Sequence, residues 1–166
     1  TTVWFSILAG APTGNKFGTF IFGTDPMVAM QGAADNGNLS ASGQGFGVTF
    51  TADGGGSGSG SPNAVAFIDD PVKTIADGTY TPPITGTHHD TSLVVGKIIW
   101  NPLGTPDQLL LFNITASDAP QPADETAIAT LSADFDQSTW DVIALWDTGS
   151  TIYDEIRFGT SYGDVT

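Results

Sequence analysis

The chain has 166 residues and a formal net charge of −14, because 18 acidic residues stand against four basic ones. So few cations, far apart in the sequence, form no basic patch, which argues against nucleic acid or an anionic membrane surface as partner. The absence of cysteine excludes disulfides, thiolate nucleophiles and cysteine zinc sites. No apolar run approaches the roughly 20 residues of a membrane span, so no membrane insertion is expected.

A single domain over 1–166 is expected, since the length is typical of one domain and 40% hydrophobic residues are enough for a core. From the N-terminus onward, short segments rich in β-branched and aromatic residues, bordered by Gly or Pro, predict strands. No segment has the 3.6-residue periodicity of a capped helix. The predicted strands are 2–10, 17–23, 46–52, 63–68, 92–100, 107–114, 138–147 and 151–159.

The number and spacing of these strands predict an all-β fold, a two-sheet antiparallel β-sandwich of the jelly-roll kind. The Gly- and Ser-rich stretch 53–62 lies between two predicted strands and is expected to be a surface loop rather than a linker between domains. Segments 92–100 and 138–147 are apolar on both faces. This pattern is typical of strands that pack on a partner sheet and are covered on the second face by loops or by another chain.

Three acidic residues are candidate cation ligands. Strict alternation in 151–159 places Asp154 on the same face as Ile156 and Phe158, which predicts an inward-pointing carboxylate. A buried carboxylate must be hydrogen-bonded, paired or bound to a metal. Asp134 and Asp136 begin like a calcium-binding EF-hand loop, but Gly at the sixth position and Glu at the twelfth are missing. A looser calcium site is the remaining alternative, and calcium is the candidate cofactor.

Two aromatic residues and two asparagines are further candidates. Trp100 and Tyr162 are candidate ligand-binding residues, since exposed aromatic rings stack on sugars, although Trp in apolar strands usually fills a core. Asn38 and Asn113 begin "NLS" and "NIT", which match the three-residue sequence for N-glycosylation. A glycan is therefore a candidate partner.

Four segments resemble the C-terminal half of LamG-like, concanavalin-A-like jelly-roll domains of secreted bacterial proteins, of the planctomycete, verrucomicrobial and PEP-CTERM kinds. The ending is the most specific, because Tyr153 to Arg157, Gly159-Thr160 and Asp164-Val165 follow the family pattern "FDEIRIGTtyadV". "TTVWFSIL" (1–8) also resembles the family's "vWfSfLl" strand. The four segments are "SLVVGKIIW" (92–100), "DQLLLFN" (107–113), "FDQSTWDVIALW" (135–146) and "YDEIRFGTSYGDV" (153–165).

The resemblance implies secretion to the extracellular space or cell surface and a two-sheet sandwich, with no catalytic motif to carry over. Related sandwiches bind glycans or proteins, often with calcium at the rim. The expected function is a non-catalytic structural, adhesive or surface-assembly role, and a lectin-like carbohydrate-binding module is the alternative. A glycoside hydrolase is a third reading, but it needs two facing carboxylates. Of the only two glutamates, Glu125 lies in the loop "PQPADETA", and Glu155 lies in the last strand without an acid at the required offsets.

The family usually has one or two strands before the "vWfSfL" strand, and this chain starts at Thr1 without Met or a signal peptide, as a processed or truncated product would. Missing strands would leave a sheet edge open. Open edges are templates for pairing with another chain. Self-association through 1–10 or 151–159 is therefore expected, unless the middle of the chain supplies the missing strands and the sandwich closes alone.

Overall fold

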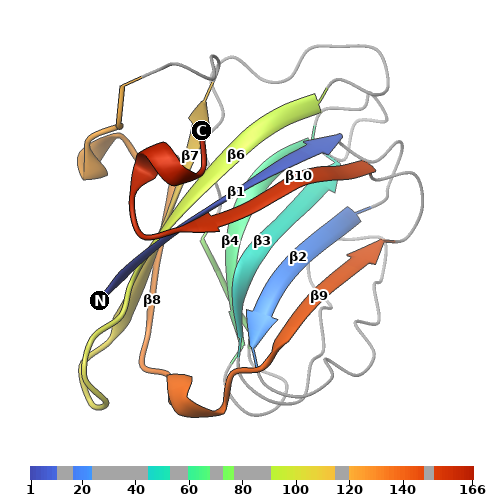
Figure 1. The fold of residues 1–166 in the computed structure, drawn as a ribbon. Coiled ribbons are helices and arrows are strands. Elements are labelled where there is room, and N and C mark those ends of the chain that lie inside the picture. Colours follow the sequence, from blue (N-terminus) through green and yellow to red (C-terminus); the bar gives the residue numbers. More distant parts are fainter. Residues whose placement is uncertain are drawn as a thin grey trace.

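A computed structural model describes residues 1–10, 17–23, 45–52, 60–67, 73–76, 91–114, 120–147 and 152–166. These residues form two antiparallel five-stranded sheets that face each other, so the fold is all-β and sandwich-like (Figure 1). Three short 3-10 turns complete the described part: η1 (Asp124–Thr126), η2 (Gln137–Thr139) and η3 (Tyr162–Asp164). None of the helices in this part is long and apolar enough to cross a membrane.

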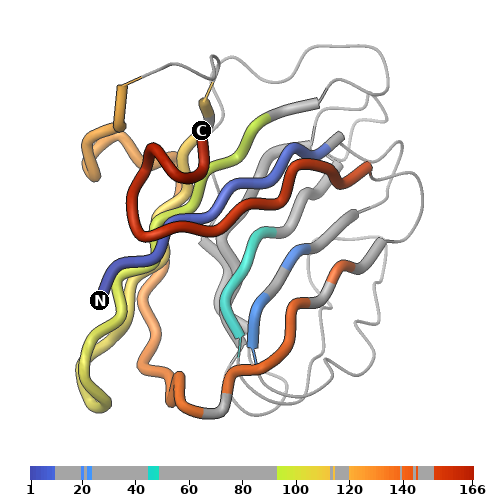
Figure 2. Tube along the Cα trace, in the orientation of Figure 1, coloured from blue at the N-terminus to red at the C-terminus, as the bar shows by residue number. Residues whose placement is uncertain are grey.

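The first sheet, sheet A, contains both ends of the chain. Its strand order is β10-β1-β6-β7-β8, so the last strand lies beside the first, as Figure 2 also shows. Its strands are β1 (Thr2–Gly10), β6 (Thr91–Ile99), β7 (Asp107–Ile114), β8 (Ala129–Ala133) and β10 (Ile152–Gly159).

The second sheet, sheet B, has the order β5-β4-β3-β2-β9. Three consecutive strands, β2 to β4, are neighbours, and the late strand β9 pairs with β2. Its strands are β2 (Phe17–Gly23), β3 (Gly45–Ala52), β4 (Gly60–Phe67), β5 (Lys73–Ala76) and β9 (Val142–Asp147).

The predicted strands differ from the observed ones in three places. Residues 60–62 belong to β4, so the predicted loop 53–62 is too long, and its remainder, 53–59, lies outside the described residues. In 138–147 the strand starts only at Val142, because η2 occupies 137–139. Strands β5 and β8 were not predicted, because "KTIA" and "ATLSA" are short and carry few large apolar side chains.

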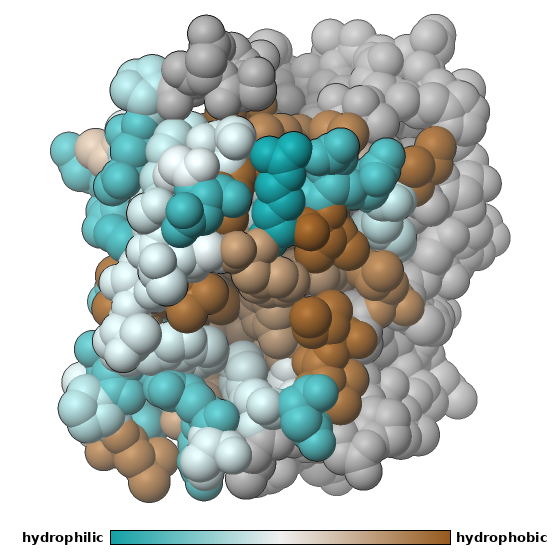
Figure 3. Space-filling model, viewed as in Figure 1, coloured by the Kyte–Doolittle hydropathy of each residue, from teal (hydrophilic) through white to brown (hydrophobic). Residues whose placement is uncertain are grey.

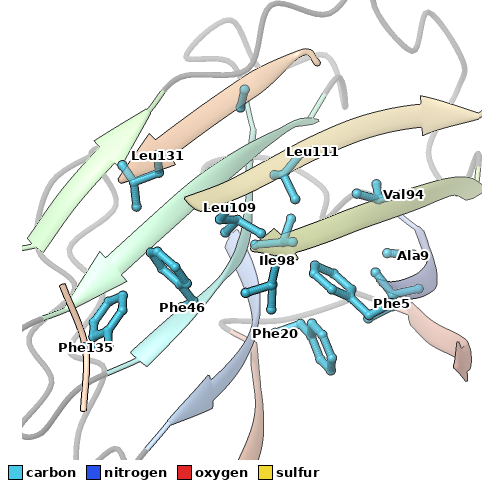
Figure 4. Packing of buried hydrophobic residues seen from close by; sticks show 13 residues of the cluster. Phe5, Ala9, Phe20, Phe46, Val94, Ile98, Leu109, Leu111, Leu131 and Phe135 are labelled. Atoms are coloured by element: carbon cyan, nitrogen blue, oxygen red, sulfur yellow. The ribbon is translucent and has the colours of Figure 1, made fainter. Parts of the chain in front are cut away.

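The main core lies between the sheets (Figure 4). Phe5 of sheet A packs against Phe20 of sheet B, with ring centroids 5.7 Å apart. The Phe5 ring also covers Gly96, its neighbour on β6, and a Cβ on that glycine would lie 2.0 Å from the ring. The packing of Phe5 against Phe20 therefore depends on the absence of a side chain at Gly96. Other buried members of this core are Ile7, Phe46, Val48, Val94, Ile98, Leu109, Leu111, Leu131 and Phe135.

A second apolar cluster covers the outer face of sheet A. Tyr162 and Val165, both after β10, lie buried against this face, and Ala127 packs there too. Lys97 of β6 holds the segment around η1 through an ion pair with Asp124 at 2.7 Å. Segment 92–100 is therefore apolar on both faces because the chain's own later segments cover the second face. The buried strand residues of this cluster are Trp4, Val95, Leu110, Phe112 and Ile114.

The two sheets are offset from each other. At one side, β8 contacts both β4 and β5. At the other side, Phe158 of β10 packs on Phe20 and Phe22 of β2, with ring centroids 6.3 and 5.6 Å apart. Since β9 lies beyond β2, sheet B extends past sheet A by its last strand (Figure 1).

Candidate interaction surface

A β-bulge in β10 decides which of its side chains face the core. Arg157 is paired with Ser6 of β1, but Asp154 is paired with Leu8, so two residues of β10 oppose one residue of β1. Glu155, at the bulge, has a φ of 51°, in the left-handed region that non-glycine residues rarely adopt. The alternation of side chains therefore reverses at this point.

The reversal makes the predicted inward orientation of Asp154 wrong. Asp154 is exposed, and its carboxylate accepts a hydrogen bond from the backbone N–H of Glu155 at 2.8 Å. Tyr153 packs against the main core instead. The prediction assumed that side chains alternate without interruption along the strand. The sequence pattern does not show where a β-bulge breaks this alternation.

The residues after β10 form a cap on sheet A. The Asp164 carboxylate accepts hydrogen bonds from the backbone N–H of Ser161 at 2.8 Å and of Thr160 at 2.9 Å, and Asp164 and Ser161 form a reciprocal capping box. Hydrogen bonds from the backbone and hydroxyl of Ser161, more than those of Thr160, hold the pKa of Asp164 below its usual value. A Cβ on Gly159 would lie 2.2 Å from the Cβ of Asp164.

The cap is tied to the outer face of β1. The buried Ser6 hydroxyl donates a hydrogen bond to the Val165 carbonyl at 2.7 Å. The edge of the Tyr162 ring packs on Trp4 with centroids 5.5 Å apart, and burial raises the pKa of Tyr162. The stretch 153–165 is thus a strand at the edge of the described sheet A, followed by a structural cap. Tyr162 is buried and offers no exposed ring for a sugar.

The other candidate cation ligands lie in loops and have protein partners. Asp134 accepts a hydrogen bond from the Gly104 N–H at 3.0 Å. Asp136 caps η2 and accepts from the hydroxyl and the N–H of Ser138, at 2.6 and 3.1 Å, which lowers its pKa. Among the described residues no three His, Asp or Glu side chains are grouped to hold a metal. A calcium site built on Asp134, Asp136 or Asp154 stays a prediction.

Asp107 is a buried acid that sequence analysis missed. Its carboxylate accepts from the Asn101 N–H at 2.7 Å, from the Phe135 N–H at 3.2 Å and from the Gln137 side-chain amide at 2.9 Å. It therefore joins the turn before β7 to the segment before β9. The only sequence signal is an acid between a Gly- and Pro-rich turn and an apolar strand, which does not distinguish a buried acid from an exposed one.

The two aromatic candidates do not share a surface. Trp100 is half-buried at the edge of the main core, stacked on Phe46 and in edge contact with Trp140, at centroid distances of 6.2 and 5.0 Å. Tyr162 belongs to the cluster on the outer face of sheet A. Of the two glycosylation candidates, Asn113 lies in β7 in register with Val94, and Asn38 lies outside the described residues.

Exposed apolar side chains gather where sheet B extends past sheet A. Ile143 and Leu145 are in register with Phe22 and Phe20, so they lie on the inner face of sheet B. They are nevertheless 56% and 47% exposed, because no strand of the described part of sheet A covers them. On β10, Ile156 and Phe158 face the same space and are 36% and 43% exposed.

We call Ile143, Leu145, Ile156 and Phe158 the β9–β10 patch. Figure 3 shows apolar surface on this side of the molecule, in the region between β10 and β9. The sequence indicated its members only as parts of apolar strands. Large contiguous apolar surface on a protein marks a site of contact with another molecule.

Four strands of the described part lie at the edges of the two sheets: β10, β8, β5 and β9. Strand β1 is not one of them, since it pairs with both β10 and β6, so the prediction that 1–10 forms a free edge is wrong. Within the described residues, strand β10 pairs only with β1, so it is an edge strand of this part of sheet A. Self-association through 151–159 stays a prediction.

No protein-family model, no curated protein and no solved structure matches this chain.

Proposed function

We propose that this chain is a non-catalytic extracellular β-sandwich of the LamG-like, concanavalin-A-like jelly-roll type, with a structural, adhesive or surface-assembly role. The observation that carries the proposal is the β9–β10 patch, in which four large apolar side chains from two different sheets are 36–56% exposed. Binding of another molecule to this patch accounts for the exposure of these apolar side chains at the margin of sheet B. The extracellular location rests on the resemblance of 153–165 to secreted domains.

The acidic residues support a structural reading. Asp107 and Asp164 accept hydrogen bonds that hold turns together, and Glu155 is ion-paired with Arg157. The other glutamate, Glu125, lies on a separate element, η1. A hydrolase would instead need two carboxylates facing a common substrate. The lectin-like alternative receives less support, because Tyr162 is buried and Trp100 is packed in an aromatic cluster.

The test is site-specific photo-crosslinking in the extracellular material of the producing cells. A photoreactive phenylalanine derivative replaces Ile143 in one protein and Leu103, an apolar residue 75% exposed on a turn, in a matched control. We expect crosslinks to another macromolecule from position 143 and not from position 103. Crosslinking to a protein supports assembly, and crosslinking to a glycan supports the lectin-like role. Equal crosslinking at both positions, or none at either, would overturn the proposal.

A further inference from the structure

We propose that the β9–β10 patch binds an extended polypeptide segment of a different protein, one in which apolar side chains alternate with Lys or Arg. The segment adds to the free edge of β10 as a sixth strand of sheet A and covers β9. This inference rests on the proposed contact role and adds the mode of binding and the chemistry of the partner.

The offset between the sheets defines where the segment lies. Among the strands that the structure describes, β10 has one hydrogen-bonded neighbour, β1, and its other edge presents backbone N–H and C=O groups to a new strand. Because Phe158 of β10 packs over β2, a strand beside β10 lies over β9, the next strand of sheet B. With this added strand, sheet A extends as far as sheet B and covers β9.

The alternation of a strand determines which side chains the segment needs on its inner face. Neighbouring residues of a strand point to opposite faces of the sheet. Every second residue of the added strand therefore lies against Ile143 and Leu145, beside Ile156 and Phe158, whose exposed surfaces are apolar. These inner positions require apolar side chains.

Charge determines the outer positions. On the outer side of β10, Asp154 and Glu155 are exposed. Arg157 offsets the charge of Glu155 through their ion pair and also donates to the carbonyl of Thr166. Among the described residues, Asp154 is then the acid of this strand that has no cation beside it. A basic side chain at the outer position beside Asp154 meets its carboxylate charge, and the net charge of −14 attracts such a partner over longer range.

A second copy of this chain does not fit these requirements. Its four basic residues are Lys16, Lys73, Lys97 and Arg157, so no segment contains two cations at alternate positions. Pairing two copies would also bring two surfaces of net negative charge together. The occupant is therefore a different polypeptide.

The bulge at Glu155 further restricts which polypeptide segments can pair with β10. Bulges and charged side chains on an edge strand oppose indiscriminate pairing. An acidic or uniformly apolar strand meets repulsion or unpaired charge at the outer positions of β10, whereas a basic one does not. Discrimination of this kind combines attraction to the right partner with repulsion of wrong ones.

The experiment measures binding of three labelled peptides to the whole chain by fluorescence anisotropy. The first alternates lysine with valine and isoleucine, the second has the same composition in shuffled order, and the third replaces lysine by glutamate. We expect the first to bind at least about tenfold more tightly than the other two. It should also slow amide hydrogen exchange in 152–159. Equal binding of the shuffled peptide would reveal charge attraction alone and overturn the proposal.

Variants locate the binding site. Ile143→Gln and Leu145→Gln should each weaken binding of the alternating peptide about fivefold or more, and Leu103→Gln, the matched exposed control, should not. Asp154→Lys, at an exposed position outside the apolar patch, should weaken binding of the same peptide as well. Circular dichroism confirms that each variant is folded. Unchanged binding in the patch variants would overturn the proposal.

Two further outcomes separate this inference from the proposed function. If sedimentation shows dimers that Leu145→Gln dissociates, and no peptide binds, a second copy occupies the patch and the inference is wrong. If the photoreactive group at position 143 crosslinks to a glycan, the contact role holds and the polypeptide partner is wrong. Absence of crosslinks would instead remove the proposed function itself.

Discussion

The turn after β10 depends on three residues, Gly159, Ser161 and Asp164, none of which is unusual by itself in the sequence. The Asp164 carboxylate reaches the N–H groups of Thr160 and Ser161 only because no Cβ at position 159 stands in the way. The glycine and the aspartate of "GTSYGD" (159–164) are thus tied to each other by backbone geometry. A close approach of this kind explains why a small residue and an acid lie five positions apart.

Gly159→Ala should destabilise the protein, whereas Gly163→Ala should not. The new Cβ at 159 would meet Asp164 at 2.2 Å, while a Cβ at 163 has nothing within 4 Å. Overpacking of this kind costs about 1–3 kcal/mol of unfolding free energy, and a compatible Gly→Ala change stays within about 1 kcal/mol. Urea denaturation of both variants tests this. Equal stability of the two would show that Asp164 moves aside without cost.

Asp164→Asn should lower the melting temperature at neutral pH and lose its effect in acid. The pKa of Asp164 is lowered in the folded state from the reference value of 3.8. Its ionised form therefore stabilises the fold fully above pH 3.8, and this contribution is lost as the pH falls through the lower, folded pKa. Melting curves of both proteins over a pH series measure the difference. A gap that stays constant into acid would show that charge at Asp164 is irrelevant.

On the scale of elements, Asp107 links two turns that are distant in sequence. It lies at the start of β7, and its partners come from the turn at Asn101 and from Phe135 and Gln137 before β9. Buried N–H groups need acceptors, because burial removes them from water. The aromatic contacts of Phe135 and Trp140 at this end of the sandwich therefore depend on one carboxylate.

Asp107→Ala should cost far more stability than Asp134→Ala. Removing the buried Asp107 carboxylate leaves buried donors unpaired, at about 1–3 kcal/mol for each. Asp134 is exposed, so water replaces its bond to Gly104. Chemical denaturation gives both values, and hydrogen exchange at the Asn101 and Phe135 amides should accelerate only in the first variant. Similar costs for the two would contradict the assigned role of Asp107.

For the molecule as a whole, sheet A has a buried apolar cluster on each of its faces, and sheet B extends beyond it. The outer face of sheet A is covered by the chain's own cap, through Tyr162 and Val165. The inner face of β9 is the part that the described residues leave uncovered. This asymmetry directs any partner to the β9–β10 patch rather than to the outer face of sheet A.

Tyr162→Ala should destabilise the whole sandwich, whereas Tyr162→Phe should be neutral or stabilising. The ring is buried against Trp4, and large-to-small core substitutions of aromatic residues cost of the order of 3 kcal/mol. The hydroxyl is buried without a partner in the described structure, so its removal loses no hydrogen bond. Thermal unfolding monitored by tryptophan fluorescence compares the two. A destabilised Tyr162→Phe protein would reveal a hydrogen bond to this hydroxyl.

Strands with strong local patterns, among them β1, β2 and β7, and hence the all-β class, could be predicted from the amino-acid sequence. Period-2 alternation and β-branched composition are properties of a few neighbouring residues, so they can be recognised without a fold. The short strands β5 and β8 were missed, because their pairing partners, rather than their own residues, make them strands.

The orientation of Asp154, the burial of Asp107 and the exposure of Ile143 and Leu145 depend on contacts between distant parts of the chain. A left-handed residue at Glu155 reversed the alternation of β10, and loops more than 25 residues apart enclosed Asp107. Strand β9 is as apolar as a central strand, yet it lies at a margin that sheet A does not reach. Each of these outcomes depends on which distant strand or loop lies opposite, and local sequence patterns carry no information about that neighbour.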